Sequence, residues 1–213
     1  MENIIQIIIA LASCITATTA YILWKQLKIL NKQLDLLREQ IKIDYEKLKR
    51  EKAVNLLIEW SKFLRQKTSL ARKLAEQLDD KQSRELFKQE PFKINKKLFK
   101  LAEAFFDIKN DKKDDEYELN EDQVARLRWE VISFLNFLES ILTAWRHNIV
   151  DRDIIMEEFQ YLINPEEGYY ILEKVRKAAG GRKVYPAIDD FVEKLKEIKE
   201  GKTPGKGPIV KNS

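Results

Sequence analysis

The chain has 213 residues, of which 44% are hydrophobic and 35% charged, and its formal net charge is +4. A single cysteine excludes a disulfide framework and a cysteine-based zinc cluster, and a single histidine removes most sites that depend on imidazole. Charge is unevenly distributed, because Glu2 is the only charged residue before Lys25. The composition therefore indicates an apolar N-terminal segment joined to a highly charged remainder.

The first predicted element is a transmembrane helix at residues 1–24. Asn3 to Trp24 is a run of 22 uncharged residues, which at about 1.5 Å per residue matches a hydrocarbon core about 30 Å thick. Amphipathic rings and basic residues mark its cytoplasmic interface: Tyr21, Trp24, Lys25 and Lys28. Because positive charge beside a span stays in the cytoplasm, we expect a single-pass protein of the bacterial inner membrane, with its N-terminus outside.

Two other interpretations of this segment stay open. A cleaved signal peptide normally has a basic start and a shorter apolar core of about 7 to 15 residues, unlike this one. The sequence Leu11-Ala12-Ser13-Cys14 resembles the lipobox of bacterial lipoproteins, in which the cysteine is lipidated. A cysteine packed in a membrane helix is the simpler interpretation of Cys14.

Small residues recur within the predicted span at helical spacing. The residues that we expect to pack against a second helix, or to line a pathway, are Gln6, Ala10, Ser13, Thr16, Ala17 and Ala20. Small side chains let helices approach closely in a membrane, and Gln6 offers an amide that can bond across the interface. Self-association is therefore expected, with the lipid bilayer as a further partner. No strict GxxxG motif is present, so a monomeric anchor remains an alternative.

A helical stalk is predicted at 25–50. No glycine or proline precedes Pro91, so nothing stops the first helix from continuing. Apolar residues recur at alternating spacings of three and four, with charged residues between them: Leu27, Leu30, Leu34, Leu37 and Ile41. This pattern predicts an amphipathic helix or coiled coil, which either joins copies of the chain or packs on the domain that follows.

Residues 51–200 are expected to form one all-α cytosolic domain. Helical spacing predicts a helix from Glu51 to about Asp79 and another that begins near Pro91 and contains Ile94. Lys109–Asp122 is acidic and is predicted to be a solvated loop, and its spacing does not fit an EF-hand. No alternating pattern typical of strands is found.

The most regular segment is a predicted central helix. Asn120 and Gln123 form a capping box at its start, and two adjoining apolar stripes indicate neighbours on both sides. It is expected to end near Arg146–Asn148, and Asp151 is expected to cap the next helix. Further helices are expected from Asn164–Glu167 to Gly180 and from Pro186 to Gly201, followed by a disordered tail at 201–213.

No sequence motif points to catalysis. Phosphate-binding, zinc-protease and serine-hydrolase motifs are absent. Helical nucleases of the HEPN type use Arg-x4-His, but Leu142 stands where the arginine before His147 is needed. We therefore expect His147 to cap a helix, and we expect a non-enzymatic protein without metal or cofactor.

Two groups of polar residues are candidate binding sites. Glu139 lies on an apolar stripe and needs donors, for which Asn136 and Arg176 are candidates; either a structural network or a ligand pocket would satisfy it. Lys93, Lys96, Lys97 and Lys100 are predicted to share a helical face. Of these, Lys93 and Lys97 are candidates to bind a nucleotide, a lipid headgroup or a protein partner.

Short motifs in this order resemble a known family. They are Leu-Trp-Lys at the end of the span, Arg50-Glu51-Lys52-Ala53 leading to Glu59-Trp60, Phe134–Glu139, and Asn148–Asp151. The chain up to about Leu195 resembles the uncharacterised bacterial domain-of-unknown-function family 4760. The resemblance implies a small membrane-anchored helical protein of a type met among mobile and phage-defence genes, with no catalytic residues to transfer.

These observations favour a self-associating membrane protein whose cytosolic domain binds a protein partner or a small nucleotide ligand. In phage defence such a protein would be an effector that opens a pore or leak. A passive membrane scaffold is one alternative, and a nucleic-acid-binding or nuclease-like domain is another. Nucleic acid is the less expected partner, because the net charge is only +4 and the aromatic residues of RNA-binding sheets are missing.

Overall fold

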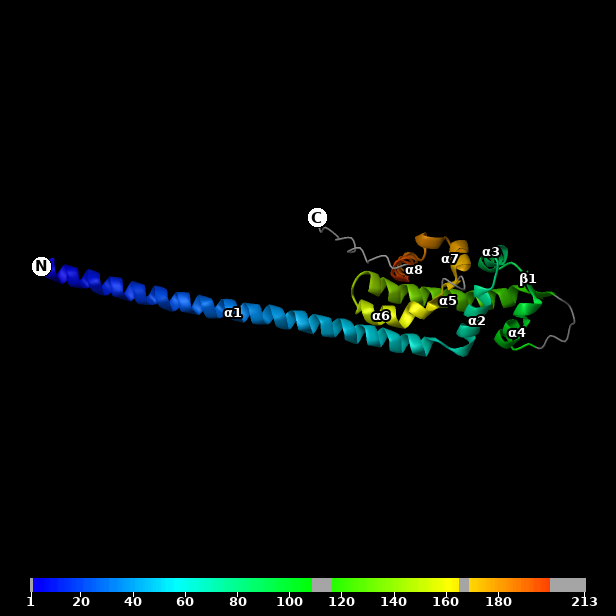
Figure 1. Cartoon of the computed structure of the whole chain (residues 1–213), viewed down its shortest axis with the longest axis horizontal. Helices are drawn as coiled ribbons and strands as arrows, with labels where there is room; N and C mark the ends of the chain where they lie inside the picture. The colour runs from blue at the N-terminus through cyan, green and yellow to red at the C-terminus, as the bar shows by residue number, and fades with distance from the viewer. Residues whose placement is uncertain (1, 109–115, 165–168, 200–213) are drawn as a thin grey trace. The chain divides into compact units, whose positions relative to one another are not determined.

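The computed structural model describes residues 2–108, 116–164 and 169–199. The chain divides into two units, Met1–Leu48 and Lys49–Ser213. Helix α1 (Glu2–Phe63) is unbroken and supplies every described residue of the first unit and the first residues of the second (Figure 1). The division falls close to Arg50, where the sequence placed the end of the stalk.

The first unit is helical throughout its described residues, as the absence of glycine and proline predicted. Thr18 Oγ1 donates to the carbonyl of Cys14 at 2.7 Å, and Thr19 Oγ1 donates to that of Ile15 at 2.8 Å, so both hydroxyls bond within the helix. Across the described residues, no helix combines the length and apolarity needed to cross a bilayer. The side chains of Ala10, Ser13 and Ala17, for which a packing role is predicted, lie outside the described residues.

The second unit is mostly helical, as predicted, and also contains short strands. After α1 its helices are α2 (Gln66–Glu76), α3 (Asp80–Lys88), α4 (Lys96–Phe106), α5 (Glu121–Arg146), α6 (Arg152–Phe159), α7 (Glu173–Ala178) and α8 (Pro186–Lys199). Its 3-10 turns are η1 (Gln160–Leu162) and η3 (Gly181–Lys183). Its strands are β1 (Phe92–Asn95), β2 (Glu116–Leu119), β3 (Ile163–Asn164) and β4 (Tyr169–Tyr170), paired antiparallel as β1–β2 and β3–β4.

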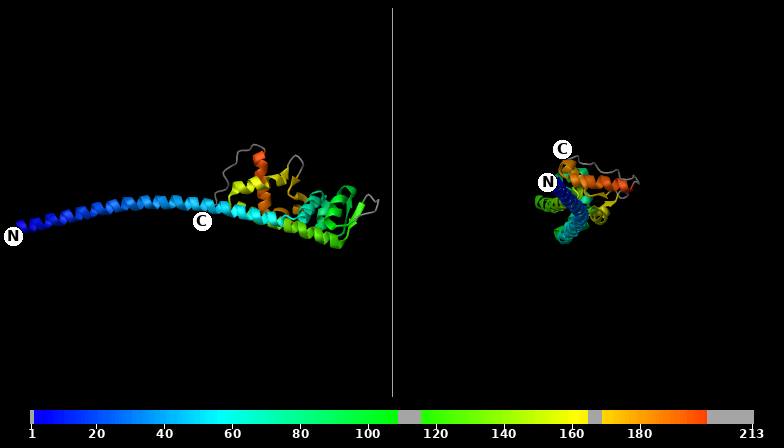
Figure 2. Two further views of the ribbon diagram at one scale, coloured as in Figure 1. Left: turned by 90° about the horizontal axis from the view of Figure 1, so that it is seen from below. Right: turned by 90° about the vertical axis from the view of Figure 1, so that its left-hand side faces the viewer.

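Helix α5 is the central helix that the sequence predicted. Asn120 and Gln123 make the capping box, with both reciprocal hydrogen bonds present. Its two stripes bury Val124, Leu127, Val131, Phe134, Leu135, Leu138, Ile141, Leu142 and Trp145. Helices α2, α3, α6 and α8 pack against it (Figures 1 and 2). A helix that is apolar on two faces thus has neighbours on both, as the pattern required.

The prediction of a helix beginning at Pro91 is wrong for its first residues. Phe92–Asn95 is strand β1, in which Phe92 and Ile94 are buried and alternate with exposed residues. It pairs with β2, which lies in the stretch expected to be a loop. Helix α4 starts only at Lys96, where the Asn95 side chain accepts from the Lys97 N–H at 3.1 Å. Proline and the aromatic Phe92 favour extended chain, and the partner strand decides the outcome.

The helix expected from Glu51 to Asp79 is also interrupted. Helix α1 ends at Phe63, and Arg65 takes an extended conformation before α2 begins. No glycine or proline marks this break, so burial of side chains decides it. Trp60 is 2% exposed, with its ring centroid 5.3 Å from that of Phe134 and 5.2 Å from that of Phe159. The turn lets α2 bury Ala71, Leu74 and Ala75 as well, which a straight continuation would not do.

Hydrogen bonds join α1, at Lys49 and Arg50, to the turn between α5 and α6. The His147 residue is the C-cap of α5, as predicted, and Asn148 has a left-handed φ of 57°. Lys49 Nζ donates to Asn148 Oδ1 at 3.3 Å, and the Asp151 N–H donates to the carbonyl of Lys49 at 3.2 Å. Asp151 caps α6, as predicted, and also accepts from Arg50 Nε at 3.3 Å. These contacts lie within the second unit.

Other expected boundaries have mixed outcomes. The Gly180 residue follows the end of α7 with a φ of 112°, and α8 begins at Pro186, both as predicted. The helix expected from Asn164–Glu167 to Gly180 is wrong for its first part, because Asn164 lies on strand β3, Tyr169–Tyr170 forms strand β4 and α7 begins only at Glu173. The antiparallel pairing of these two strands and the left-handed residues that follow them are incompatible with a helix there. Residues 165–168 and the predicted disordered tail at 201–213 lie outside the described residues.

Candidate functional site

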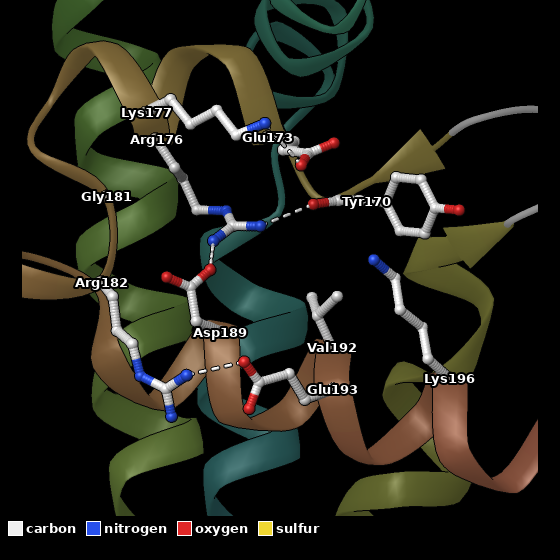
Figure 3. A pocket seen from close by; sticks show the side chains of 10 residues that line it. All are labelled: Tyr170, Glu173, Arg176, Lys177, Gly181, Arg182, Asp189, Val192, Glu193 and Lys196. Atoms are coloured by element: carbon white, nitrogen blue, oxygen red, sulfur yellow. Dashed lines mark hydrogen bonds and ion pairs between the residues drawn. The ribbon is translucent and has the colours of Figure 1, made fainter.

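A pocket of about 280 Å³ lies between β4, α7, η3 and α8 (Figure 3). Charged side chains dominate its lining, which consists of Tyr170, Glu173, Arg176, Lys177, Gly181, Arg182, Asp189, Val192, Glu193 and Lys196. Its charged groups number four cations and three carboxylates. Such a lining suits a small polar or charged molecule, because seven of its ten residues carry a charged group that can pair with one.

Arg176 forms the buried base of this pocket and is only 3% exposed. Its Nε donates to the carbonyl of Ile171 at 2.8 Å, and its Nη2 donates to that of Tyr170 at 2.8 Å. Its Nη1 bonds to the carboxylate of Asp189 on α8. All three nitrogens of the guanidinium therefore have partners, which is what a charge buried this deeply requires.

The carbonyls that Arg176 holds belong to an unusual turn. Ile171 and Leu172 are consecutive, buried, non-glycine residues in the left-handed region, with φ of 52° and 55°. A β-branched residue rarely adopts this conformation, so the surrounding structure must stabilise it. Arg176 does so from α7. Glu76 does so from α2, because its carboxylate accepts a hydrogen bond from the backbone N–H of Leu172.

The environment of Glu76 changes its acidity. Burial raises the pKa of its carboxyl above the ordinary value of 4.5, against the opposing influence of Arg72, whose Nη1 lies 3.7 Å from Glu76 Oε1. The carboxylate is thus a buried acid behind the pocket, connected to it through the Ile171–Leu172 turn.

Ion pairs cover the rim of the pocket. Lys177 Nζ lies 2.9 Å from Glu173 Oε1, and this hydrogen bond lowers the pKa of the Glu173 carboxyl. Arg182 Nη1 lies 2.6 Å from Glu193 Oε1, and its Nη2 contacts Asp190. Because the cations of these pairs are well exposed, at 70% for Lys177 and 57% for Arg182, a ligand or a partner chain can exchange their carboxylate partners at little energetic cost.

One further cation faces an aromatic ring. Lys196 Nζ lies 4.0 Å from the centroid of the Tyr170 ring, within the range of a cation–π contact. No histidine or cysteine lines the pocket. Across the part of the chain that the structure describes, no group of three or more histidine, cysteine, aspartate or glutamate residues is arranged to hold a metal.

Glu139 lies outside this pocket. Its Oε1 accepts from the Ala187 N–H at 2.8 Å and its Oε2 accepts from the Ile188 N–H at 2.9 Å, so the carboxylate caps the first turn of α8. Of the partners expected from the sequence, Asn136 is exposed and Arg176 pairs with Asp189. The three residues predicted to act together are therefore divided between two places, and only Arg176 lines the pocket.

The predicted basic face is divided as well. Lys93 lies on strand β1, so it does not share a helix with Lys97, and the prediction of one helical face is wrong for it. Lys93 Nζ donates to Glu116 Oε2 at 3.1 Å, and this bond raises the pKa of the lysine. Lys97 is exposed at the start of α4.

The side chains described in the predicted span are exposed in the single chain. They include Gln6, Thr16 and Ala20 from the predicted packing set, and Cys14. At the predicted interface the rings of Tyr21 and Trp24 have centroids 6.3 Å apart, and Lys28 Nζ lies 5.7 Å from the Trp24 centroid. Lys25 is exposed beside them.

Sequence reasoning missed most of the pocket. Asp189 was not singled out, because an acid in the first turn of a helix is ordinarily explained by the helix dipole. The available signal was its position between the apolar residues Ile188 and Val192, which turn the same part of α8 inward. Tyr170 and Arg182 carry no local signal, since only the fold brings them together.

Comparisons with known proteins identify no relative: no family model, curated protein or solved structure matches the chain. The resemblance to family 4760 stays a prediction that rests on the short motifs quoted above.

Proposed function

We propose that this protein is a non-enzymatic membrane-anchored effector, whose N-terminal helix sits in the bacterial inner membrane and whose cytosolic helical unit binds a small charged ligand. The observation that carries the proposal is the uncharged run Asn3–Trp24 within one unbroken helix. The aromatic residues and lysines at the end of this run support the orientation with the N-terminus outside.

Self-association is the second part of the proposal. The apolar stalk residues are exposed in the single chain, from 45% for Leu34 to 67% for Ile41. Exposed apolar residues at heptad spacing form the seam of a coiled coil when a second helix covers them. Copies of this chain are the natural partner, since a shared bilayer holds them parallel.

The pocket supports the ligand-binding part. Lys177 and Arg182 are exposed cations at its rim, and Arg176 provides a fixed positive base. An anionic small molecule, for example a nucleotide phosphate, would exchange the rim carboxylates for its own negative charge. In the effector version, this exchange shifts the membrane helices and opens a leak.

Anchoring is tested with single cysteines, since Cys14 is the natural chain's only one. In a Cys14→Ser background, we expect Glu2→Cys to react with a membrane-impermeant maleimide on spheroplasts, and Glu46→Cys to react only after lysis. The protein should stay in the membrane pellet after carbonate extraction. Release by carbonate, or the reverse labelling, would contradict the proposal. If the protein were instead a lipoprotein, the Cys14→Ala variant would not be processed to the mature form.

The leak is tested separately by membrane potential on expression. A potential that stays normal while the oligomeric protein is toxic would exclude the leak but leave anchoring intact. Ligand binding is tested by calorimetric titration of the full chain with nucleoside phosphates, where Arg182→Ala should weaken binding and Lys81→Ala, at an exposed lysine that does not line the pocket, should not.

A passive scaffold is the second candidate function, and one observation favours it. Arg176, Lys177 and Arg182 all have carboxylate partners within the protein, so their charges are satisfied without a ligand. A scaffold predicts that replacing Lys177 and Arg182 leaves cellular activity unchanged.

A further inference from the structure

A second apolar stripe runs along α1 and was not part of the predicted stalk. Its members are seven residues apart: Ile15, Ile22, Ile29, Leu36 and Ile43. Each is exposed, from 49% for Ile22 to 66% for Ile15. Scattered exposed apolar residues need no explanation, but a repeat of seven keeps one helical face apolar over its whole length.

The two stripes lie on different sides of the helix. With seven-residue periodicity the stripe of Ile29, Leu36 and Ile43 lies about 130° around the helix axis from the seam of Leu27, Leu30, Leu34, Leu37 and Ile41. Glutamines, also seven residues apart, occupy the arc between them: Gln26, Gln33 and Gln40. The opposite side carries the charged residues, among them Lys32, Asp35 and Glu39. A helix that packs against one partner needs one apolar stripe. This helix has two, which indicates two neighbouring helices.

We propose that the stalk assembles as a closed ring of parallel helices, in which the first stripe of each copy packs against the second stripe of the next. This inference rests on the self-association proposed above and adds the number of neighbours. Contacts about 130° apart on each helix close a ring of roughly five to eight copies, since head-to-tail contacts close when the rotation permits.

Copies of this chain fit the surface better than another protein does. Both stripes have the same seven-residue repeat, so each matches the other along about 24 Å of stalk from Leu27 to Ile43. The glutamines between the stripes are self-complementary, because an amide both donates and accepts and therefore pairs with its own copy. Charged residues between the stripes would favour a different protein that carries the opposite charges. From Gln26 to Gln40 no charged residue lies between the stripes.

The ring has a chemical consequence for its axis. Residues in the arc between the two contacts face inward, so Gln26, Gln33 and Gln40 would surround the centre, while the charged side faces water. An axis lined by uncharged amides is polar and hydrated, unlike the apolar centre of a two-stranded coiled coil.

The first experiment measures the mass of the full chain in detergent by native mass spectrometry. We expect about five or more copies for the wild type. The variant Ile29→Gln, Leu36→Gln, Ile43→Gln should fall to a dimer, because only the first stripe remains. Its matched control is Lys32→Gln, Glu39→Gln, Glu46→Gln, on the charged side, which should keep the full mass. Glutamine has a high helix propensity, so both variants retain the helix.

The outcomes separate the two proposals. A wild-type dimer would overturn the ring and leave self-association standing, whereas a wild-type monomer would overturn both. An unchanged mass in the second-stripe variant would also overturn the ring.

A second measurement is independent of those variants. In a Cys14→Ser background, a chain with both Leu34→Cys and Leu36→Cys should oxidise to a ladder longer than a dimer, because position 34 of one copy meets position 36 of the next. The single Leu36→Cys variant should remain without cross-links. A double variant that stops at the dimer would contradict the ring.

Discussion

The two units of this chain hold their apolar side chains in opposite ways. In Met1–Leu48 the large apolar side chains that the structure describes are exposed, whereas every buried hydrophobic residue described lies between Ala53 and Leu195. The second unit therefore has a core that stabilises it without help from another molecule. The first unit has large apolar side chains that nothing within the described chain covers. Substitutions in the two units should consequently affect different properties, folding in one and association in the other.

The largest expected effect concerns the core of the second unit. Trp60→Ala removes a ring that packs against Phe63, Phe134, Phe137 and Phe159. We expect it to lower the free energy of unfolding by about 3 to 5 kcal/mol, as large-to-small changes in cores do. The measurement is a urea titration of the full chain in detergent, followed by circular dichroism.

The matched control for this change is Trp129→Ala. Trp129 is 72% exposed on α5, so its removal should leave the urea midpoint nearly unchanged. Equal shifts of the urea midpoint for the two variants would contradict the conclusion that the buried core, and not exposed surface, stabilises the second unit.

A buried charge gives the next largest effect. Arg176→Met keeps the length of the side chain but removes the partner of Asp189 and of the carbonyls of Tyr170 and Ile171. Removal of one partner from a buried ionic network is expected to lower the free energy of unfolding by about 3 kcal/mol. Arg182→Met, on the exposed rim, should leave unfolding unchanged, and a larger effect at Arg182 than at Arg176 would contradict this assignment.

The smallest expected effect is a dependence on pH. Burial raises the pKa of Glu76 in the folded state, so the folded state binds the proton more tightly than the unfolded state does. Its stabilising contribution is complete below the ordinary value of 4.5 and is lost as the pH rises through the raised pKa. The total change is about 1.4 kcal/mol for each pH unit by which the pKa is raised.

This dependence is measured by comparing the wild type with Glu76→Gln. The amide keeps an acceptor for the Leu172 N–H but does not titrate. As the pH falls from 7 to about 4, the unfolding free energy of the wild type should rise relative to that of the variant. A difference that stays constant across this range would show that the carboxyl is not perturbed by burial.

Local patterns predicted what local interactions determine. The central helix with its Asn120 capping box, its end near Arg146 and the start of α8 at Pro186 were all foreseen, because each depends on residues close in sequence. The break at Arg65 and strand β1 were not, because neighbours distant in sequence decide them.

The candidate site was less predictable than the fold. Arg176 was identified, but its partner Asp189 was not, and Glu139 was assigned to the wrong partners. A charged residue on an apolar stripe predicts that a partner is present, but the sequence does not predict which element supplies that partner. The second stripe could have been predicted from its seven-residue repeat. It was missed because the Leu27–Ile41 seam was sufficient to predict an amphipathic helix.

The cap that Glu139 places on α8 means that the hydrogen bonds of a residue on α5 depend on a helix made much later in the chain. The two N–H groups that satisfy this carboxylate belong to Ala187 and Ile188, which leave the ribosome long after α5 has been made. A chain cut before Pro186 would lack both of these N–H groups, so an apolar stripe of α5 would carry a carboxylate without the donors that the folded protein supplies.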